Sequence, residues 1–258
     1  MAGPRETAVA NPLFESLLRL ADDRLVLGHR LSEWCGHGPM LEEDIALANI
    51  ALDLVGQASA LLTLAGAIEG AGRDGDALAY FRNETDFRNA QLVELPKGDF
   101  AFTIVRQFLF DAYSVLVWDA LQRCRHAELA GIAAKALKED SYHLRHSSDW
   151  VLKLGDGTGE SHARAQRALD DLWRFTGELF EADGVDAAVS ALGFPVDRPA
   201  LQARWRTMVA DVIARATLAL PADAGMATGG RRGRHTELLG HMLSEMQFVA
   251  RSHPGAQW

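Results

Sequence analysis

The sequence predicts an all-α protein: a helical bundle followed by additional C-terminal helices. Long stretches place apolar residues every three to four positions, the period of a helix that buries one face. Segments that alternate with a period of two are nearly absent, and the best strand candidate, residues 91–95, is too short to build a sheet. Runs rich in Gly and Pro separate the helical stretches, which is typical of helices joined by loops.

Four long helices are expected before residue 155, at residues 12–34, 41–69, 100–125 and 127–154. The first is dense in Leu and ends at residues 35–39, where Gly and Pro cannot cheaply continue a helix. The second opens with Glu42, Glu43 and Asp44, whose charges suit the positive end of the helix dipole. These lengths predict a four-helix bundle.

Shorter or later helices are expected at residues 77–83, 161–182, 186–192, 199–218 and 236–251. No composition shift marks a second domain, so residues 11–258 are predicted as one domain after a disordered leader, residues 1–10. The core bundle is expected to cover about residues 12–154. The helices of about residues 160–252 are expected to pack onto it.

Composition narrows the class of protein. With 258 residues, 48% apolar and 24% charged, the chain can bury a sizeable core. A net charge of −9 argues against nucleic acid or an anionic membrane as its partner. No stretch approaches about 18 uninterrupted apolar residues, so no membrane-spanning helix is expected. Cys35 and Cys124 are too few for a disulfide framework, which indicates a reducing, cytoplasmic location.

The helix at residues 127–154 carries ionisable residues in the middle of its apolar stripe. Asp140 and His143 are three residues apart and therefore point the same way. Buried charge is costly unless it is paired, hydrogen-bonded or bound to metal. Helix bundles use this spacing to place a carboxylate and a histidine on one metal.

A dinuclear iron bundle needs a Glu from each of two helices and Glu-x-x-His from each of the other two. Asp111 is the only charge on the apolar stripe of residues 100–125, and Glu33 lies on the mixed stripe of the first helix. The second helix has no histidine, since none occurs between His37 and His126. The sequence therefore offers at most half of such a site.

Several interpretations of these residues stay open. Asp140 and His143 form a buried hydrogen-bonded pair, bind a metal, or lie at a surface or interface. Asp111 is expected to pair with a buried basic residue rather than to bind metal. Glu33 also suits a helix-end residue without a metal role. A dinuclear site with an unusual ligand set would draw on Asn49 or Asp53 of the second helix.

A strongly basic loop, residues 228–235, precedes the last helix in an otherwise acidic protein. Its Arg231, Arg232 and Arg234 could grip an anion, such as the phosphates of a coenzyme A tail, or an acidic partner. A solvated loop without a ligand is the alternative, because a short basic run alone is a weak signal.

Beside these residues, the chain resembles the C subunits of bacterial phenylacetyl-CoA 1,2-epoxidases (ring-1,2-epoxidases), the PaaC family. The resemblance covers nearly the whole chain after residue 15. It rests on LVLGHRLSEWCGHGPMLEEDIALANIALDLVGQA (25–58), KALKEDSYHLRHSSDW (135–150), LWRFTGELF (172–180), TGGRRGRHTELLGHMLSEMQFVAR (228–251) and the terminal PGAQW.

The resemblance implies a ferritin-like bundle that is a structural, non-catalytic subunit. Its implied partner is a related catalytic subunit with a di-iron centre, which epoxidises the ring of phenylacetyl-CoA with NADPH and O2. A reductase component with flavin and an iron–sulfur cluster and small accessory subunits complete the complex. Paired bundles of this kind bury a large interface, for which the apolar faces of the first two helices are the expected place.

The resemblance also implies a degenerate metal site. At the ligand positions of its catalytic relatives, this chain retains Glu33, Asp111, Asp140 and His143, and it holds Leu54 and Gln57 where a Glu and a His are expected. We therefore expect this chain to bind no metal or other cofactor. An independent di-iron oxidase and a ferritin-like storage or binding protein are the competing functions.

Overall fold

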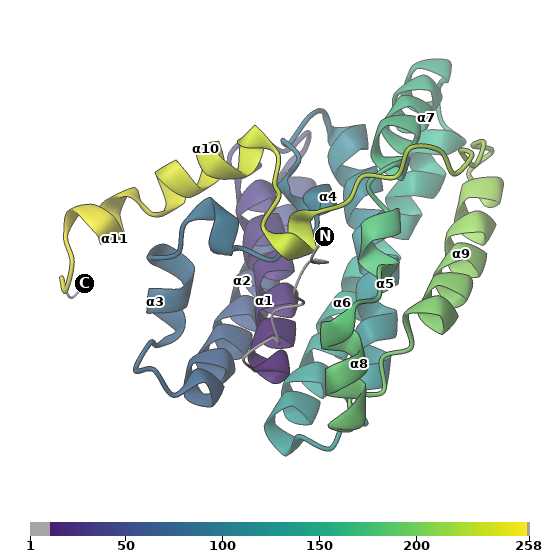
Figure 1. Cartoon of the computed structure of the whole chain (residues 1–258). Helices are drawn as coiled ribbons and strands as arrows, with labels where there is room; N and C mark the ends of the chain where they lie inside the picture. Colours follow the sequence, from purple (N-terminus) through teal and green to yellow (C-terminus); the bar gives the residue numbers. More distant parts are fainter. Residues whose placement is uncertain (1–10, 257–258) are drawn as a thin grey trace, which may run out of the picture.

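The computed structural model describes residues 11–256, which form helices and contain no strand (Figure 1). The predicted all-α fold is confirmed. The leader expected at residues 1–10 lies outside the described residues, as do Gln257 and Trp258.

The α-helices, in chain order, are α1 (Pro12–Ser32), α2 (Leu41–Glu69), α3 (Gly75–Tyr80), α4 (Gln91–Glu94), α5 (Phe100–Leu121), α6 (Ala127–Gly155), α7 (Gly159–Trp173), α8 (Gly184–Ala191), α9 (Arg198–Arg215), α10 (Glu237–Met246) and α11 (Phe248–Ser252). Three short 3₁₀ helices lie between them: η1 (Glu84–Asp86), η2 (Gly177–Phe180) and η3 (Gly230–Arg232).

Helices α1, α2, α5 and α6 form a ferritin-like four-helix bundle. Helix α1 packs along α2, α5 packs along α6, and α2 touches α6 across the bundle. One long connection, residues 70–99, carries the chain from α2 to α5, as in ferritin-like folds. The central helices are α1 and α5, because residues 17–28 and 103–118 are all buried.

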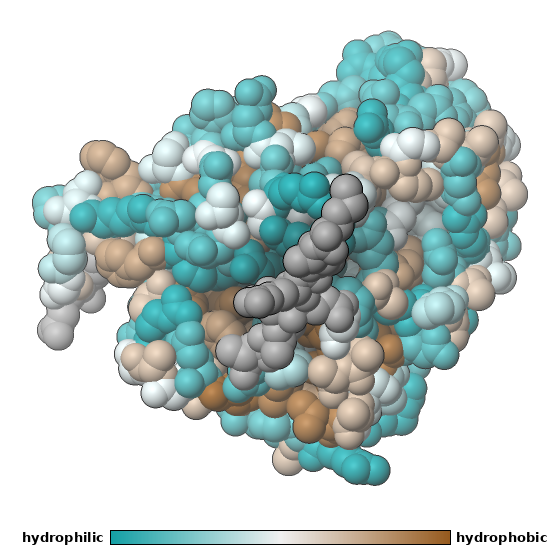
Figure 2. All heavy atoms as spheres, viewed as in Figure 1, coloured by the Kyte–Doolittle hydropathy of each residue, from teal (hydrophilic) through white to brown (hydrophobic). Residues whose placement is uncertain are grey.

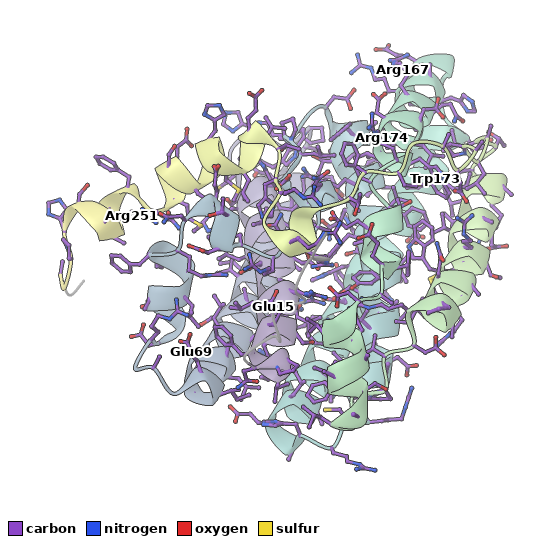
Figure 3. All side chains as sticks on the ribbon, viewed as in Figure 1. Glu15, Glu69, Arg167, Trp173, Arg174 and Arg251 are labelled. Carbon is purple, nitrogen blue, oxygen red and sulfur yellow. The ribbon has the colours of Figure 1, made fainter. Side chains whose placement is uncertain are left out.

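The later helices pack onto this bundle. Helices α7 and α9 contact α5 and α6, and α8 contacts α1. Trp173 of α7, labelled in Figure 3, packs against Trp205 of α9 with ring centroids 5.5 Å apart and ring planes tilted by 32°. Such aromatic pairs add to the stability that burial provides. Trp205 Nε1 also donates to the Leu109 carbonyl of α5 at 3.0 Å, which fixes the pair to the core bundle.

Helices α10 and α11 form an arm that runs beyond α3 (Figure 1). Gln247, at the junction of the two helices, donates its side-chain amide to the carbonyls of Ala79 and Arg82, each at 3.0 Å. Arg251, labelled in Figure 3, donates to the carbonyl of Tyr80 at 3.0 Å. Hydrophobic side chains are exposed over α11 (Figure 2), where Phe248 is 67% exposed.

Two expected helices differ most from what the sequence suggests. Helix α7 ends at Trp173 instead of residue 182, because the Thr176 hydroxyl donates to the Trp173 carbonyl and Gly177 follows. The last helix divides at Gln247, whose tether to the α3 segment redirects the chain. In both places side-chain contacts with backbone override the helical period.

Residues 91–95, the best strand candidate, include the single helical turn α4. The backbone N–H groups at its start donate to carboxylates rather than to a neighbouring strand: Ala90 to Asp23 at 2.8 Å and Gln91 to Glu178 at 2.8 Å. Carboxylates from α1 and η2 thus satisfy the donors that a sheet would otherwise have to pair.

Candidate functional site: a buried polar cluster in the bundle

Polar side chains from all four bundle helices meet in the core. Asp140 of α6 lies at their centre and is fully buried. Its Oδ1 accepts a hydrogen bond from Gln57 Nε2 of α2 at 2.8 Å. Its Oδ2 accepts from the Ser114 hydroxyl and from Trp118 Nε1 of α5, the latter at 2.9 Å. Both oxygens are therefore satisfied by protein donors, as a buried carboxylate requires.

Arg24 of α1 supplies a fully buried positive charge beside this carboxylate. Its guanidinium donates to Gln57 Oε1 at 3.1 Å and to the Ser114 hydroxyl at 2.6 Å, the two residues that in turn bond Asp140. It also lies 4.0 Å from the centroid of the Trp118 ring, in the stacked geometry that arginine favours. Burial lowers the pKa of Arg24, while Asp140 acts in the opposite direction. A guanidinium stays protonated in proteins, so Arg24 remains a cation.

His143 lies one turn along α6 and faces two carboxylates. Its Nε2 is 3.1 Å from Oδ2 of Asp53, on α2, and its Nδ1 is 3.4 Å from Oδ1 of Asp140. The second distance is long for a hydrogen bond, so this contact is mainly electrostatic. Burial lowers the pKa of His143, but Asp140, Asp111 and Asp53 outweigh it and raise the pKa to about 9. The ring therefore carries a proton on both nitrogens at neutral pH.

The same contacts separate the pKa values of two aspartic acids of this cluster, Asp140 and Asp111. Burial raises the pKa of Asp140, but His143 and Arg24 outweigh it and hold that pKa below its usual range. Asp111 accepts from Gln107 at 2.6 Å and from Ser147 at 2.8 Å, without a cation in hydrogen-bonding contact. Burial raises the pKa of Asp111 to about 7 against the opposing charge of His143. Asp140 is thus ionised while Asp111 titrates near neutrality.

The structure brings together four of the six residues that the sequence suggested for a degenerate metal site. Gln57, Asp140 and His143 meet directly, and Asp111 reaches them through Ser147 of α6. Leu54 is buried beside Gly28 of α1, where it packs between the two helices.

Glu33 does not join the cluster. It lies just past the end of α1, and its carboxylate accepts from Arg30 at 2.7 Å. The interpretation of Glu33 as a helix-end residue holds, and the α1 residue at the centre is Arg24. The sequence contained the signal, because Arg24 is a lone charge on the apolar stripe of Leu20, Leu27 and Leu31.

The basic loop is divided between interior and surface. Arg231 is buried, and its guanidinium binds both oxygens of Asp23 on α1, at 2.9 and 2.8 Å. Arg232 and Arg234 are exposed. Of the three arginines suggested for contact with a ligand or partner, Arg231 instead points into the fold.

Glycines set the course of this loop. A Cβ on Gly230 would lie 2.3 Å from the Asn89 carbonyl oxygen, so only glycine permits this approach. The N–H groups of Gly229 and Gly230 donate to Glu178 of η2, at 2.7 and 2.6 Å. The glycine-rich run thus packs the loop against η2 and the connection of residues 70–99 instead of forming an open anion-binding loop.

Comparison with known proteins shows the family of this chain. The model of the family described as "Phenylacetic acid catabolic protein" matches residues 4–258. The chain belongs to this family. Among its relatives is the Escherichia coli K12 protein named as the C subunit of 1,2-phenylacetyl-CoA epoxidase. It is 50% identical over 248 residues, which cover 96% of this chain and all of the relative. The resemblance inferred from the sequence motifs is therefore confirmed.

The buried cluster of this family member does not suit a dinuclear iron site like that of di-iron bundles. Among residues 11–256, no three His, Cys, Asp or Glu side chains are placed to hold a metal ion together. The donor set also disagrees chemically. Both oxygens of Asp140 already accept from N–H and O–H groups, and Arg24 places a permanent cation where added metal charge would be repelled.

The pKa values of His143 and Asp111 predict that this family member loses stability as the pH rises. The pKa of His143 is about 9 in the fold and about 6.5 in an unfolded chain, so its stabilising contribution is full below pH 6.5 and lost through pH 9. The pKa of Asp111 is raised from 3.8 to about 7, so the fold favours its protonated form and that contribution is lost as the pH rises through 7.

Urea unfolding between pH 5 and 10 tests this prediction. His143→Gln is expected to flatten the decline in the free energy of unfolding between pH 7 and 9. The exposed His241→Gln variant is the control and should keep the wild-type slope. Equal slopes for wild type and His143→Gln would contradict the assignment.

Proposed function

We propose that this chain is the C-type subunit of a phenylacetyl-CoA epoxidase and serves it as a structural, non-catalytic component. The name of the Escherichia coli relative, the C subunit of a 1,2-phenylacetyl-CoA epoxidase, supports the complex and its substrate class. In this proposal the chain scaffolds a related catalytic subunit, in the cytoplasm, during aerobic phenylacetate degradation. That subunit holds the di-iron centre, and a reductase component with flavin and an iron–sulfur cluster passes it electrons from NADPH.

The observation that carries the non-catalytic role is Arg24. A fully buried guanidinium bonds the two side chains, Gln57 and Ser114, that hold Asp140. Fixed N–H and O–H donors therefore meet the charge of this carboxylate, and a metal would have to displace them. Buried polar groups that bond one another in this way hold the helices that carry them in one arrangement.

Iron analysis of the purified chain tests this role. After expression in iron-supplied cells, the chain is expected to contain iron well below one atom per molecule. The catalytic subunit, expressed and purified in the same way, is the positive control for loading. A full dinuclear complement in this chain would contradict the proposal.

An independent di-iron oxidase with an atypical ligand set is the alternative, and Asp53 is the observation in its favour. Oδ2 of Asp53, on α2, lies 3.1 Å from Nε2 of His143, on α6. Helix α2 thus places a carboxylate where a dinuclear site would need a ligand from this helix. The variants Asp140→Asn and His143→Gln separate the two functions in the reconstituted complex. Oxygenase turnover per assembled complex should stay near wild type if the chain is structural. Loss of turnover at unchanged assembly and stability would favour the alternative.

A further inference from the structure

A groove lies between α3 and the arm that α10 and α11 form (Figure 1). Its volume is about 440 Å³, within the range of pockets that hold small organic groups. Its walls are mainly apolar and include Tyr80, Phe81, Met246 and Val249. Phe81 and Val249 are each 50% exposed, so the groove is open to an apolar group. We call it the α3–α11 groove.

Helix α11 lacks the burial that a short helix needs. It has five residues and none of them is buried. Helices of this length are not stable by themselves in water. The side chain of Arg251 holds α11 in place by donating to the carbonyls of Tyr80 and Arg82, at 3.0 and 2.7 Å. An apolar group that fills the α3–α11 groove would add the missing burial.

A turn after α11 leads the chain to this groove. The N–H of Ala256 donates to the carbonyl of His253 at 3.2 Å, and Gly255 has a φ of 79°. Pro254 and Gly255 stand at the second and third positions of the turn, which is the sequence signature of a type II β-turn. His253, Gly255 and Ala256 also line the groove. The sequence of the turn thus fixes where the chain continues.

Trp258 has the reach and the chemistry to fill the groove. It follows Ala256 by two residues, and two extended residues span at most roughly 7 Å. An indole is a large apolar group with one polar N–H, for which a buried tryptophan usually finds an acceptor. Asp76, an exposed residue that also lines the groove, carries a carboxylate that can accept it.

Attachment to the same chain favours Trp258 over an occupant from outside. A group on a short linker acts at an effective concentration in the millimolar range, without the cost of bringing two molecules together. Nine of the described residues line the groove, whereas a stable interface between two proteins uses roughly 20–30 residues a side. The groove alone is therefore too small for a second copy of the chain.

We propose that Trp258 binds in the α3–α11 groove and holds the arm against α3. Its indole ring lies between Phe81 and Val249, and its N–H donates to Asp76. The contact joins α11 to the connection of residues 70–99. It depends neither on the partner nor on the reaction of the proposed complex.

The fluorescence of Trp258, taken as the difference between the full-length chain and its Trp258→Phe variant, tests this position. A bound indole is expected to emit at a shorter wavelength than a solvent-exposed one and to be quenched several-fold less by acrylamide. Val249→Asp, which places a charge in the groove, should abolish both effects. Phe248→Asp changes the neighbouring residue, which is 67% exposed and does not line the groove, and should leave both unchanged.

Hydrogen exchange measures what the contact does for the arm. Trp258→Ala is expected to speed exchange about tenfold in residues 76–81 and 248–253, because the burial of one large apolar side chain is lost. Val249→Asp should have the same effect and add nothing to Trp258→Ala. Gly255→Ala, which strains the turn, should act in the same direction. Circular dichroism and thermal unfolding verify that each variant is folded.

Two results would overturn the proposal. One is a Trp258 that acrylamide quenches freely in the otherwise wild-type chain, or unchanged exchange in Trp258→Ala. The other is protection that appears only at high protein concentration, since the groove would then hold Trp258 of a second copy. Faster exchange in the Trp258 and groove variants alone, at every protein concentration, supports it.

Discussion

Replacing Arg24 with leucine is expected to lower the free energy of unfolding by about 3–5 kcal/mol at pH 7, the usual cost of removing one partner of a buried ionic pair. Leucine fills part of the space but leaves Asp140 without its arginine, and Gln57 and Ser114 without the donor from which both now accept. Urea unfolding followed by circular dichroism measures the loss. Arg167→Leu, which changes an exposed arginine of α7, should alter stability by less than about 0.5 kcal/mol.

A double-mutant cycle identifies the origin of this loss. If Arg24 mainly compensates Asp140, then Arg24→Leu with Asp140→Asn should be more stable than the sum of the single losses predicts, because both charges are gone. Additive losses would mean that Arg24 acts through its packing on Trp118 instead. A loss below about 1 kcal/mol in Arg24→Leu would contradict the assigned role of the buried cation.

The buried cluster shows what periodicity can and cannot find. Asp111, Asp140 and His143 each interrupt an apolar stripe of the sequence, and all three are buried as that pattern requires. Arg24 also interrupts an apolar stripe. A guanidinium is not a metal ligand, however, so a search for the ligand pattern of a di-iron bundle does not select it. Residue type and resemblance suggest Glu33 as a ligand, although its place at the helix end allows it to pair with Arg30 near the surface.

Contacts between helices cannot be predicted from the period of one helix. The sequence places Asp53 on a face of α2 next to the one that bears Gln57, yet both residues contact α6, because the interface between two helices is wider than one stripe. The break at Gln247 depends on a contact of the same kind, with the α3 segment, whereas the helix end at Trp173 depends on a local hydrogen bond from Thr176. The fold class needed only periodicity and breaks, so it could be predicted fully.

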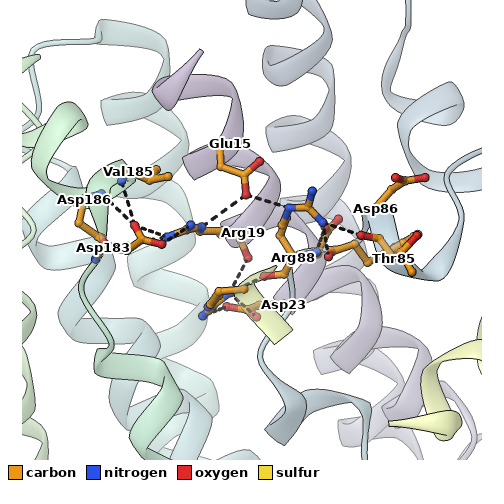
Figure 4. Close-up of polar contacts among 12 residues, drawn as sticks. Glu15, Arg19, Asp23, Thr85, Asp86, Arg88, Asp183, Val185 and Asp186 are labelled. Atoms are coloured by element: carbon orange, nitrogen blue, oxygen red, sulfur yellow. Dashed lines mark hydrogen bonds and ion pairs between the residues drawn. The ribbon is translucent and has the colours of Figure 1, made fainter. Parts of the chain in front are cut away.

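Replacing Arg231 with alanine is the second change expected to have a large effect, a loss of about 3–5 kcal/mol. Its guanidinium binds both oxygens of Asp23, a residue that also accepts from the N–H of Ala90. Asp23 belongs to a band of ion pairs along α1, in which Arg19 reaches Asp183 and Arg88 reaches Glu15 (Figure 4). Without Arg231, the Asp23 carboxylate stays buried with less compensation.

The same loop offers matched controls. Arg232→Ala and Arg234→Ala remove exposed arginines within three residues of Arg231, and surface pairs contribute about 0–1 kcal/mol. Hydrogen exchange should become faster across residues 228–236 in Arg231→Ala alone, because the pair with Asp23 joins this segment to α1. Equal stability of all three variants would contradict the structural role of Arg231.

These variants also decide what remains of the ligand hypothesis for the loop. The guanidinium of Arg231 already binds Asp23. In this loop, only Arg232 and Arg234 therefore have guanidinium groups available to contact a coenzyme A phosphate or an acidic partner. Weaker acyl-CoA binding by the assembled complex of Arg232→Ala or Arg234→Ala, at unchanged stability, would show such a contact. If acyl-CoA binding weakens only in Arg231→Ala, together with its loss of stability, the loop affects binding only by stabilising the fold. Its role is then to hold the C-terminal segment on the bundle through the pair of Arg231 and Asp23.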